Sequence, residues 1–562
     1  MTSRGGCERP EEKGQIIIIF ALFLTVLTVL AALLYTGAGT LVLRRQLQNW
    51  GDGAALAAAN IMVTGTTTAT STCTSARIAS SGTGNDLYTA AKNYLVNTAG
   101  WTAAQVTARM TMSCPSGYDL AAVNVSLSQS GPNWFGGGNL TVATSSSAIN
   151  GQVANGDYSV ALLDPSNPTW TGHGGRTGCA SYIISGTAAV TYEGSVIVDS
   201  TCTLATSTAG SIKATSSSFT MTMVNGAKII TGGEVNAASV SNISPAATED
   251  FRPLYPDPLA GLTPPCHATS AVDCLGNTGS LPATDMDTTG SGHCKTMKVA
   301  CVLSPGTYTG GILAANGSGV KTLLLRPGVY YIAGGGFQLK GGSAQIISIP
   351  ALTGTCGGTG TCSDTNAVAR YCNPTNQNNG SCQLTSDQVG ANWASDCPPP
   401  PASITCGVLI YNAKSDSNSG WQTSGGSSDA IDNGSQGVLL LRAYNPTYDT
   451  IAANGATANS SAFASYKNLV MWQARTPAPT ASAAQPTISM VGGACIVLSG
   501  TVYGAGAPIV FGGGSCGTSG GADAQLALQF VAWDLTLSGN NTFYFKYNRA
   551  YFAKPYAYGL TQ

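Results

Sequence analysis

Residues that could carry out acid–base chemistry are sparse in this chain, because only 9% of its residues are charged. Enzymes that cleave glycosidic bonds need two carboxyl groups that converge on one bond. Carboxylate oxygens also bind Ca²⁺, and Asp429 with Asp432 suggest a weak calcium site, although the complete ligand spacing of a calcium-binding loop is absent. The densest acidic residues lie in Gly-, Ser- and Thr-rich segments that are typical of solvated turns: Asp285, Asp287, Asp416, Asp429 and Asp432.

The three histidines are the other candidates for chemistry: His173, His267 and His293. The last two are adjacent to Cys266 and Cys294, but the intervals around them do not repeat a zinc-ligand pattern. Three runs of glycine lack the Lys-Ser/Thr of a phosphate-binding loop. We therefore expect a protein that is not an enzyme and has no catalytic residue, cofactor or metal. The alternative is a surface-attached carbohydrate-active enzyme of the glycoside hydrolase or polysaccharide lyase type.

The overall composition indicates a mainly β protein. The net charge is −1, so there is no basic field that would attract nucleic acid. The chain has 70 glycines, and its apolar residues, 43% of the total, come mostly in short runs of Val, Ile and Leu. Short strands joined by glycine-rich turns have this composition.

Cysteine usage indicates an oxidising compartment. Of the 17 cysteines, only Cys7 precedes a long apolar segment near the N-terminus, and the rest lie after it. So many cysteines without paired metal-ligand spacing predict disulfides in an extracytoplasmic space. Connectivity cannot be read from sequence, but two close pairs are candidate bridges, Cys179 with Cys202 and Cys495 with Cys516.

The apolar segment predicts a single membrane-spanning helix. No charged residue occurs from Gly14 to Leu43, and the segment is bounded by Lys13 and by Arg44-Arg45. About 20 apolar residues suffice to cross a hydrocarbon core. A cleaved signal peptide is the alternative, but its apolar region would be about 7–15 residues long. The residues expected inside the membrane are Ile16, Ile17, Ile18, Ile19, Phe20, Ala21, Leu22, Phe23, Leu24, Leu27, Leu30, Leu33 and Leu34.

Helical spacing continues beyond the apolar segment. Leu43, Leu47 and the alanines from Ala54 onward recur near helical intervals, so we expect the helix to extend to about residue 60 and to dock on the ectodomain. Gly37, Gly39, Gly51 and Gly53 would weaken this helix or allow close packing against a neighbour. A flexible stalk is the alternative. The charge difference across the helix is small, so the cysteines decide the orientation, with residues 1–13 as a cytoplasmic tail.

The same region carries a family resemblance. Residues 13–22 read KGQIIIIFAL, and residues 44–57 read RRQLQNWGDGAALA. From Gly14 to Asn60 the chain resembles TadE/TadG-like Flp pilus-assembly (tight adherence) proteins. Trp50, Gly51 and Gly53 stand where that family usually has small helix formers.

The resemblance also bears on processing of the N-terminus. Pilins and TadE-like pseudopilins are cut after a glycine and carry a glutamate five residues further on. A cut between Gly14 and Gln15 would put Ile19 at that position. The missing glutamate favours a TadG-like, membrane-retained member over a filament subunit.

A small α+β unit is expected over residues 61–155. Leu87, Ala91 and Leu95 predict a short helix near residues 86–95, and apolar runs predict strands over 105–112, 120–127 and 140–143. The resemblance implies a pilin-like unit at this place.

A parallel β-solenoid is expected beyond the small unit. Glycines at 178, 194, 210 and 226 recur every 16 residues, and a short apolar run follows three of them, as stacked coils would require. Coils are expected over 156–250, 301–352 and 402–542, with a loop insertion over 251–300 and a Cys-rich insertion over 353–401. The aromatic segment 543–562 would cap the last coil. The phrases at 255–262 and 327–337 also resemble large TadG-like proteins with β-helical ectodomains.

The function that these expectations imply is structural. The chain would be a single-pass protein of a bacterial cytoplasmic membrane that displays its C-terminal ectodomain at the cell surface. Its partners would be pilin or other pilus-assembly proteins, and also cell-wall glycan or a host surface. An envelope adhesin without a link to pili is a further alternative.

Overall fold

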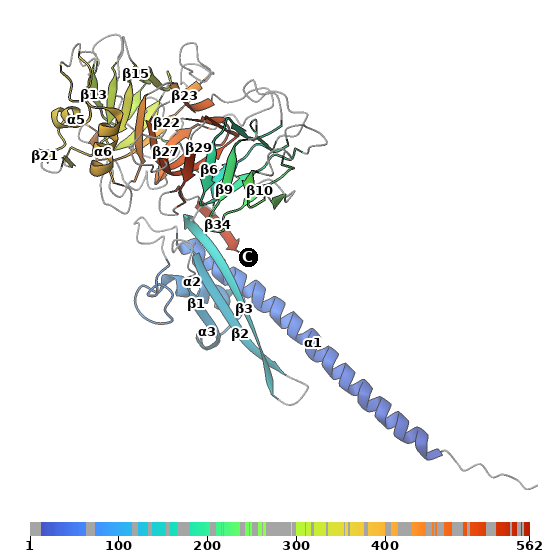
Figure 1. Ribbon diagram of the computed structural model, residues 1–562. Helices are drawn as coiled ribbons and strands as arrows, with labels where there is room; N and C mark the ends of the chain where they lie inside the picture. The colour runs from blue at the N-terminus through green and yellow to red at the C-terminus, as the bar shows by residue number, and fades with distance from the viewer. Residues whose placement is uncertain are drawn as a thin grey trace, which may run out of the picture. The chain divides into compact units, whose positions relative to one another are not determined.

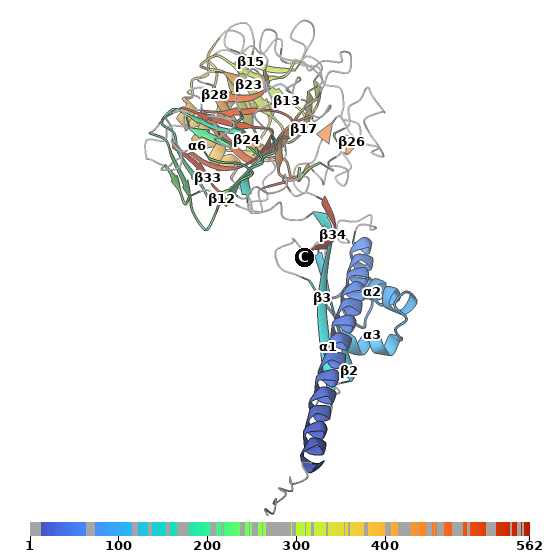
Figure 2. The same ribbon diagram turned by 90° about the vertical axis from the view of Figure 1, so that its right-hand side faces the viewer.

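The computed structural model divides into two compact units, residues 1–153 with 556–562, and residues 154–555. Figures 1 and 2 show the two units, and each is described by itself below. The structure describes residues 13–561 except 63–72, 115–121, 133–137, 153–157, 166–178, 203–209, 215, 217, 236–241, 247, 250–256, 261, 263, 266–293, 295–298, 309–310, 316–319, 333–334, 353, 358–359, 376–379, 399–405, 414–428, 435–436, 446–451, 454–455, 458–465, 475–486, 492–494, 513–523, 540–541, 548–551 and 554–555.

Three helices belong to the first unit. The helix α1 (Lys13–Ile61) is continuous through all four glycines that were expected to weaken it, so the stalk alternative is wrong. The helix α2 (Asp86–Asn97) buries the predicted apolar face, Leu87, Ala91 and Leu95. The helix α3 (Ala103–Arg109) occupies most of the expected strand 105–112, because Thr102 and Gln105 form a capping box that starts a helix there.

The first unit also contains an antiparallel sheet. Its strands β1 (Met110–Ser113), β2 (Ala122–Pro132), β3 (Asn139–Gln152) and β34 (Tyr556–Thr561) are hydrogen-bonded in that order. The long β2–β3 hairpin lies along α1 in both views (Figures 1 and 2). The C-terminal strand β34 pairs with β3, so the end of the chain completes the unit that the beginning of the chain starts.

The second unit consists of ladders of short parallel strands. The longest ladder runs, in spatial order, through β14 (Gly306–Tyr308), β17 (Gly328–Ile332), β22 (Gly407–Asn412), β27 (Leu469–Gln473), β29 (Cys495–Gly504), β31 (Ala524–Ala532), β4 (Tyr158–Leu162), β7 (Ser195–Val198), β10 (Ile229–Thr231) and β12 (Thr248–Glu249).

A second ladder contains β15 (Ile312–Ala315), β18 (Phe337–Lys340), β23 (Asp429–Gly434), β28 (Thr487–Val491), β30 (Ile509–Phe511), β32 (Leu535–Ser538), β5 (Tyr182–Ser185) and β8 (Ile212–Ala214). A third set of parallel strands has two parts. One part joins β13 (Ala300–Leu303), β16 (Thr322–Leu325), β19 (Gln345–Ser348), β24 (Val438–Ala443) and the start of β29. The other part joins the start of β31 to β33 (Thr542–Phe545), β6 (Ala189–Tyr192), β9 (Thr220–Met223) and β11 (Ile243–Ser244).

The order of strands in the ladders differs from their order in the chain. The chain enters at β4 and proceeds to β12 at one end of the longest ladder, and it then resumes at the opposite end with β14. The later strands return toward the starting point, where Phe530 of β31 pairs with Val160 of β4. The strand β4, where the chain enters the second unit, and the late strand β31 are therefore direct neighbours in the middle of the longest ladder.

The strands enclose a continuous apolar core. In β7, buried Val196 and Val198 alternate with partly exposed residues, as a strand with one covered face requires. The side chains that point inward from all the ladders form one cluster, which includes Val160, Ile184, Leu323, Ile410 and Phe530. The mainly β fold class with a long apolar N-terminal helix is thus confirmed, with antiparallel pairing in the first unit and parallel pairing in the ladders.

The predicted 16-residue period does not correspond to one coil. Val196 of β7 pairs with Ile229 of β10, thirty-three residues later in the chain. The strand that follows Gly210 is β8, which belongs to a different ladder. Successive glycines in the series therefore precede strands on different faces, and two glycine intervals make about one coil. Gly178 lies outside the described residues.

The aromatic C-terminal segment is not a cap. The strand β33 pairs with β31 on one side and with β6 on the other, and Phe545 stacks on Tyr192 at 4.7 Å between ring centroids. The last strand, β34, belongs to the first unit. The prediction failed because it assumed that the last coil in sequence is the last coil in space.

The Cys-rich insertion contains two helices that the sequence reading missed, α5 (Asp364–Tyr371) and α6 (Ser386–Asp396). Two short antiparallel pairs complete the described elements, β20 (Thr355–Cys356) with β21 (Gly360–Thr361), and β25 (Ala452–Ala453) with β26 (Ala456–Thr457). Disulfides form as expected in a cysteine-rich ectodomain: Cys73–Cys114, Cys179–Cys202, Cys294–Cys301, Cys356–Cys362, Cys372–Cys382 and Cys397–Cys406.

Candidate membrane-anchoring and assembly site

The first half of α1 has the properties of a membrane span. It is long and apolar enough to cross a bilayer, and its most apolar window is not buried against the protein. The exposed fractions are 66% for Ile19 and 74% for Leu34. Ten of the residues that the sequence assigned to the membrane are exposed, as are Val26 and Val29: Ile18, Ile19, Phe20, Leu22, Phe23, Leu24, Leu27, Leu30, Leu33 and Leu34.

Threonine hydroxyls in this half of α1 are satisfied within the helix. Thr25 donates to the carbonyl oxygen of Ala21 at 2.7 Å, and Thr28 donates to that of Leu24 at 2.7 Å. Thr36 makes the same bond to Ala32. Polar groups that face hydrocarbon must find partners within the protein, so these threonines are compatible with a lipid surrounding.

The second half of α1 is part of a protein core. Leu47, Ala54 and Ala58 recur on one helical face and are fully buried. They pack with α2, with α3 and with one face of the antiparallel sheet, in a cluster that also contains Trp101 and Val125. The predicted docking of the helical extension on a folded part of the chain is thus observed within the first unit, and the change from exposed to buried occurs just after Arg44 and Arg45.

Two glycines allow this close packing. A β-carbon at Gly53 would lie 2.1 Å from the ring of Tyr94 on α2, and one at Gly51 would lie 2.6 Å from the hydroxyl of Ser146 on β3. At Gly39, in the membrane half, nothing lies within 4 Å of such a carbon. Gly51 and Gly53 therefore let neighbouring elements approach the helix, which agrees with the expectation of close packing.

Polar interactions fix the elements around α1. Arg77 makes a two-pronged ion pair with Asp86 at the start of α2, at 2.6 and 2.8 Å. The hydrogen bond from Arg77 lowers the pKa of the Asp86 carboxyl below its usual 3.8. Gln48 of α1 donates a hydrogen bond to the hydroxyl of Ser146 of β3 at 3.0 Å. The disulfide between Cys73 and Cys114 joins residues that are 41 positions apart in the first unit.

The proposed processing position lies at the start of α1. Gly14 and Gln15 are within the helix, as are Ile16 and Ile17, whose side chains lie outside the described part of the structure. Ile19 occupies the place of the pilin glutamate and is exposed on the apolar surface.

The acids and histidines considered for chemistry have side chains that lie outside the described part of the structure. Asp429 and Asp432 belong to the backbone of β23, and their side chains are outside the described part of the chain. Asp285, Asp287, Asp416 and the three histidines are also outside it. Within the described residues, no group of three His, Cys, Asp or Glu side chains is placed to hold a metal ion.

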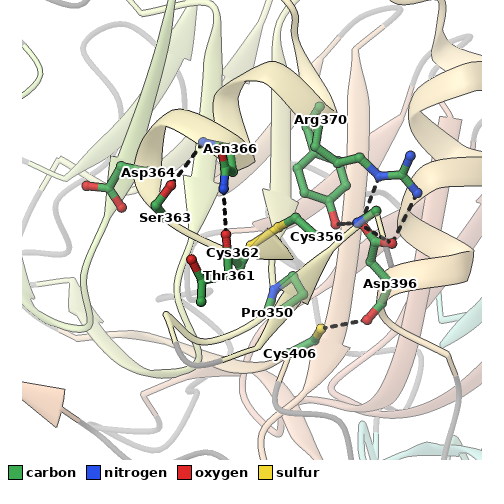
Figure 3. The surroundings of a disulfide bond; sticks show 12 residues. Pro350, Cys356, Thr361, Cys362, Ser363, Asp364, Asn366, Arg370, Asp396 and Cys406 are labelled. Carbon is green, nitrogen blue, oxygen red and sulfur yellow. Dashed lines mark hydrogen bonds and ion pairs between the residues drawn. A yellow bond between two sulfur atoms is a disulfide. The ribbon is translucent and has the colours of Figure 1, made fainter. Parts of the chain in front are cut away.

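A buried ion pair in the Cys-rich insertion was not anticipated. Asp396 at the end of α6 accepts hydrogen bonds from Arg370 at 2.9 Å and from the hydroxyl of Tyr371 at 3.0 Å, both on α5 (Figure 3). Burial, with the negative charge of Asp396 second, raises the pKa of Tyr371 far above its usual value. The nearby Cys356–Cys362 disulfide holds the segment that leads into α5. These residues join α5 to α6, so the described part of the insertion contains packed helices.

The candidate disulfides have a mixed outcome. Cys179 and Cys202 are bonded, as predicted, and the hydroxyl of Ser200 donates to the carbonyl of Cys179 at 2.8 Å. Cys495 is also disulfide-bonded, whereas Cys516 lies outside the described residues.

Comparison with known proteins bears on α1. Residues 14–60 match the Tad family, described as putative Flp pilus-assembly TadE/G-like. The matched residues coincide with α1 almost from end to end, and the family match leaves the rest of the chain unaddressed. No curated protein and no solved structure matches the chain at a significant level.

Proposed function

We propose that this protein is a membrane-tethered, non-catalytic structural component of Flp/Tad pilus assembly or tight adherence. The observation that carries the proposal is the coincidence of the Tad family match at residues 14–60 with a helix that is apolar and unburied in its first half. The second half of the same helix is built into a folded unit. The helix thus holds that unit to the membrane, where the partners would be pilin or other assembly proteins.

The ectodomain is proposed to face the outside of the cytoplasmic membrane. The disulfides in the described structure all follow α1, and stable disulfides form in oxidising compartments. The 12 residues before α1 then form the cytoplasmic tail.

The ladders of the second unit are proposed to be the faces of a parallel β-solenoid. The pairing between successive coils is parallel in each ladder, and the inward side chains form one core, which supports this architecture. A stack of coils presents a long outer surface on which weak contacts can be repeated. Such a surface suits multivalent attachment to pilin, cell-wall glycan or a host surface.

A genetic test addresses the pilus role. Deletion of the gene is expected to reduce Flp pili sheared from the cells and attachment of cells to a surface. The wild-type gene should restore both, whereas a chain in which a cleavable signal peptide replaces residues 1–43 should not, because its ectodomain is released. Unchanged pili and attachment after deletion would contradict the proposal.

A topological test addresses the tether. Protease added to intact cells, or to cells with a permeabilised outer membrane, is expected to digest the ectodomain while leaving a membrane-bound fragment that contains α1. N-terminal sequencing should find an uncut N-terminus. A start at Gln15 would instead restore the pilin-processing hypothesis, and a start beyond Tyr35 would identify a signal peptide and refute the tether.

The proposed lack of catalysis has its own test. The purified full chain in detergent, incubated with a panel of cell-wall and capsular polysaccharides, is expected to generate no new reducing ends or unsaturated products. The carbohydrate-active alternative would be favoured if either product were released by the wild type and if that release were lost after substitution of buried aspartates.

A further inference from the structure

The β2–β3 hairpin runs along α1 toward the membrane half of that helix. Ser146 of β3 contacts Gln48 and lies close to Gly51 of α1. Further toward the hairpin end, a β-carbon at Gly131 of β2 would lie 3.5 Å from Leu43. The position reached on α1 therefore moves from residue 51 to residue 43 as the hairpin approaches its end, and both ribbon views show this course (Figures 1 and 2).

Leu43 marks the outer boundary of the uncharged stretch. Gly14 to Leu43 carry no charge, and a helix of that length spans about 45 Å, the thickness of a bilayer with its headgroup layers. Arg44 and Arg45, which are exposed, follow at once. The last described pair of the hairpin, Pro132 with Asn139, lies one residue beyond Gly131 and Leu140, so this described end of the hairpin reaches the depth of the headgroup layer.

The composition of the hairpin suits this depth. Residues 120–156 contain no Asp, Glu, Lys, Arg or His, although the hairpin is an exposed projection. Leu140, which pairs with Gly131, is 41% exposed, yet it lies on the same face of β3 as the buried residues Ser146 and Ala148. The face of β3 that is buried at Ser146 and Ala148 is thus exposed at Leu140.

We propose that the end of the β2–β3 hairpin enters the headgroup layer of the membrane that α1 crosses, so that lipid covers Leu140. This inference rests on the proposed membrane tether. It assigns the first unit a second attachment to lipid, which fixes the rotation and tilt of that unit about α1. A single helix would leave the unit free to turn about its axis.

Photocrosslinking tests the proposal in the full chain. The crosslinker p-benzoylphenylalanine is introduced in place of Leu140, and the protein is reconstituted into vesicles of phosphatidylethanolamine and phosphatidylglycerol. Leu27 within α1 serves as the lipid-contacting control, and Leu352, which is 60% exposed in the second unit, serves as the matched exposed leucine. Mass spectrometry of the corresponding peptides after irradiation is expected to show the mass of one phospholipid added at positions 27 and 140 but not at 352.

The outcomes distinguish failure of the hairpin attachment from failure of the proposed membrane tether. Lipid adducts at position 27 without adducts at position 140 would overturn the second attachment and leave the tether intact. Equal labelling at 140 and 352 would also overturn it. Absence of adducts at position 27 would refute the membrane tether itself. In each variant, recovery of the Cys73–Cys114 disulfide peptide verifies that the first unit has folded.

Discussion

At the scale of single residues, small side chains on α1 determine what the helix can contact. The sequence identified Gly51 and Gly53 as weak points or contact points, and it could not decide between them because both effects come from the same missing β-carbon. The structure decides it through the partners, Ser146 and Tyr94, which come from distant parts of the sequence. Glycines with no neighbour, such as Gly39, lie in the half assigned to lipid.

We predict that Gly53→Val destabilises the first unit, whereas Gly39→Val does not. Both changes replace glycine by the same residue within one helix, so helix propensity cancels in the comparison. The valine at position 53 would have to displace Tyr94, and overpacking of this kind costs about 1–3 kcal/mol. Thermal unfolding in detergent, followed by near-ultraviolet circular dichroism, measures the difference. Equal melting temperatures for the two variants would refute the close-packing role.

The ion pair between Arg77 and Asp86 predicts a dependence of stability on pH. Because the pKa of Asp86 is lower in the folded protein than its usual 3.8, the pair stabilises the folded state above about pH 4. This contribution disappears as the pH falls through the folded pKa. Asp86 is partly exposed, so solvent screens the pair and the effect is small.

The corresponding experiment compares the wild type with Asp86→Asn. The variant should melt at a lower temperature at pH 7, and the gap should close below about pH 4 as the wild-type carboxyl becomes protonated. Arg77→Gln should give the same profile, and combining the two changes should add little. A gap that persists unchanged at pH 3 would show that Asp86 acts through something other than its charge.

At the scale of elements, strands and long apolar helices were predictable, and short polar helices were not. Runs such as residues 323–325 and 438–441 are strands in the structure, because each supplies inward side chains to the core. The helices α5 and α6 escaped detection because their apolar residues are few and are surrounded by cysteines and polar residues. Their signals were the cap residues, Ser363 for α5 and Thr385 with Gln388 for α6.

Trp393 of α6 is the residue that we predict to hold the insertion against the strands. It is buried, donates from its ring nitrogen to the carbonyl of Ser348 at 2.9 Å, and lies under the guanidinium of Arg442 at 4.3 Å. Trp393→Ala should cost about 3–5 kcal/mol and expose the insertion to limited proteolysis. Gly390→Ala on the same helix, where a β-carbon meets nothing within 4 Å, should leave resistance unchanged or increase it.

At the scale of the whole molecule, the sequence predicted stacked coils but not their order. Composition and apolar runs are local properties, whereas the pairing of β4 with β31 joins residues that are far apart in the chain. The assumption that coils stack in chain order gave the predicted cap. The candidate anchoring site was more predictable, since one continuous helix carries most of it.

The second unit is an insertion between β3 and β34 of the first unit. Gln152 and Tyr556 are directly paired in an antiparallel ladder, so a tight turn can join them. We predict that replacing residues 153–555 by Asn-Gly yields a folded first unit in detergent. Its Cys73–Cys114 disulfide should form, and its circular dichroism should show helix with antiparallel sheet. A chain that stays unfolded would show that the first unit depends on the second.

The neighbouring position of the first and last coils also governs how the protein can be made. As the chain is synthesised from its N-terminus, β4, β5 and β6 emerge long before their partners β31, β32 and β33. One edge of the early coils therefore stays open, and open strand edges invite pairing with other chains. The seam between first and last coils closes only after the C-terminal strands arrive, so a chain truncated there would present an adhesive edge to its neighbours.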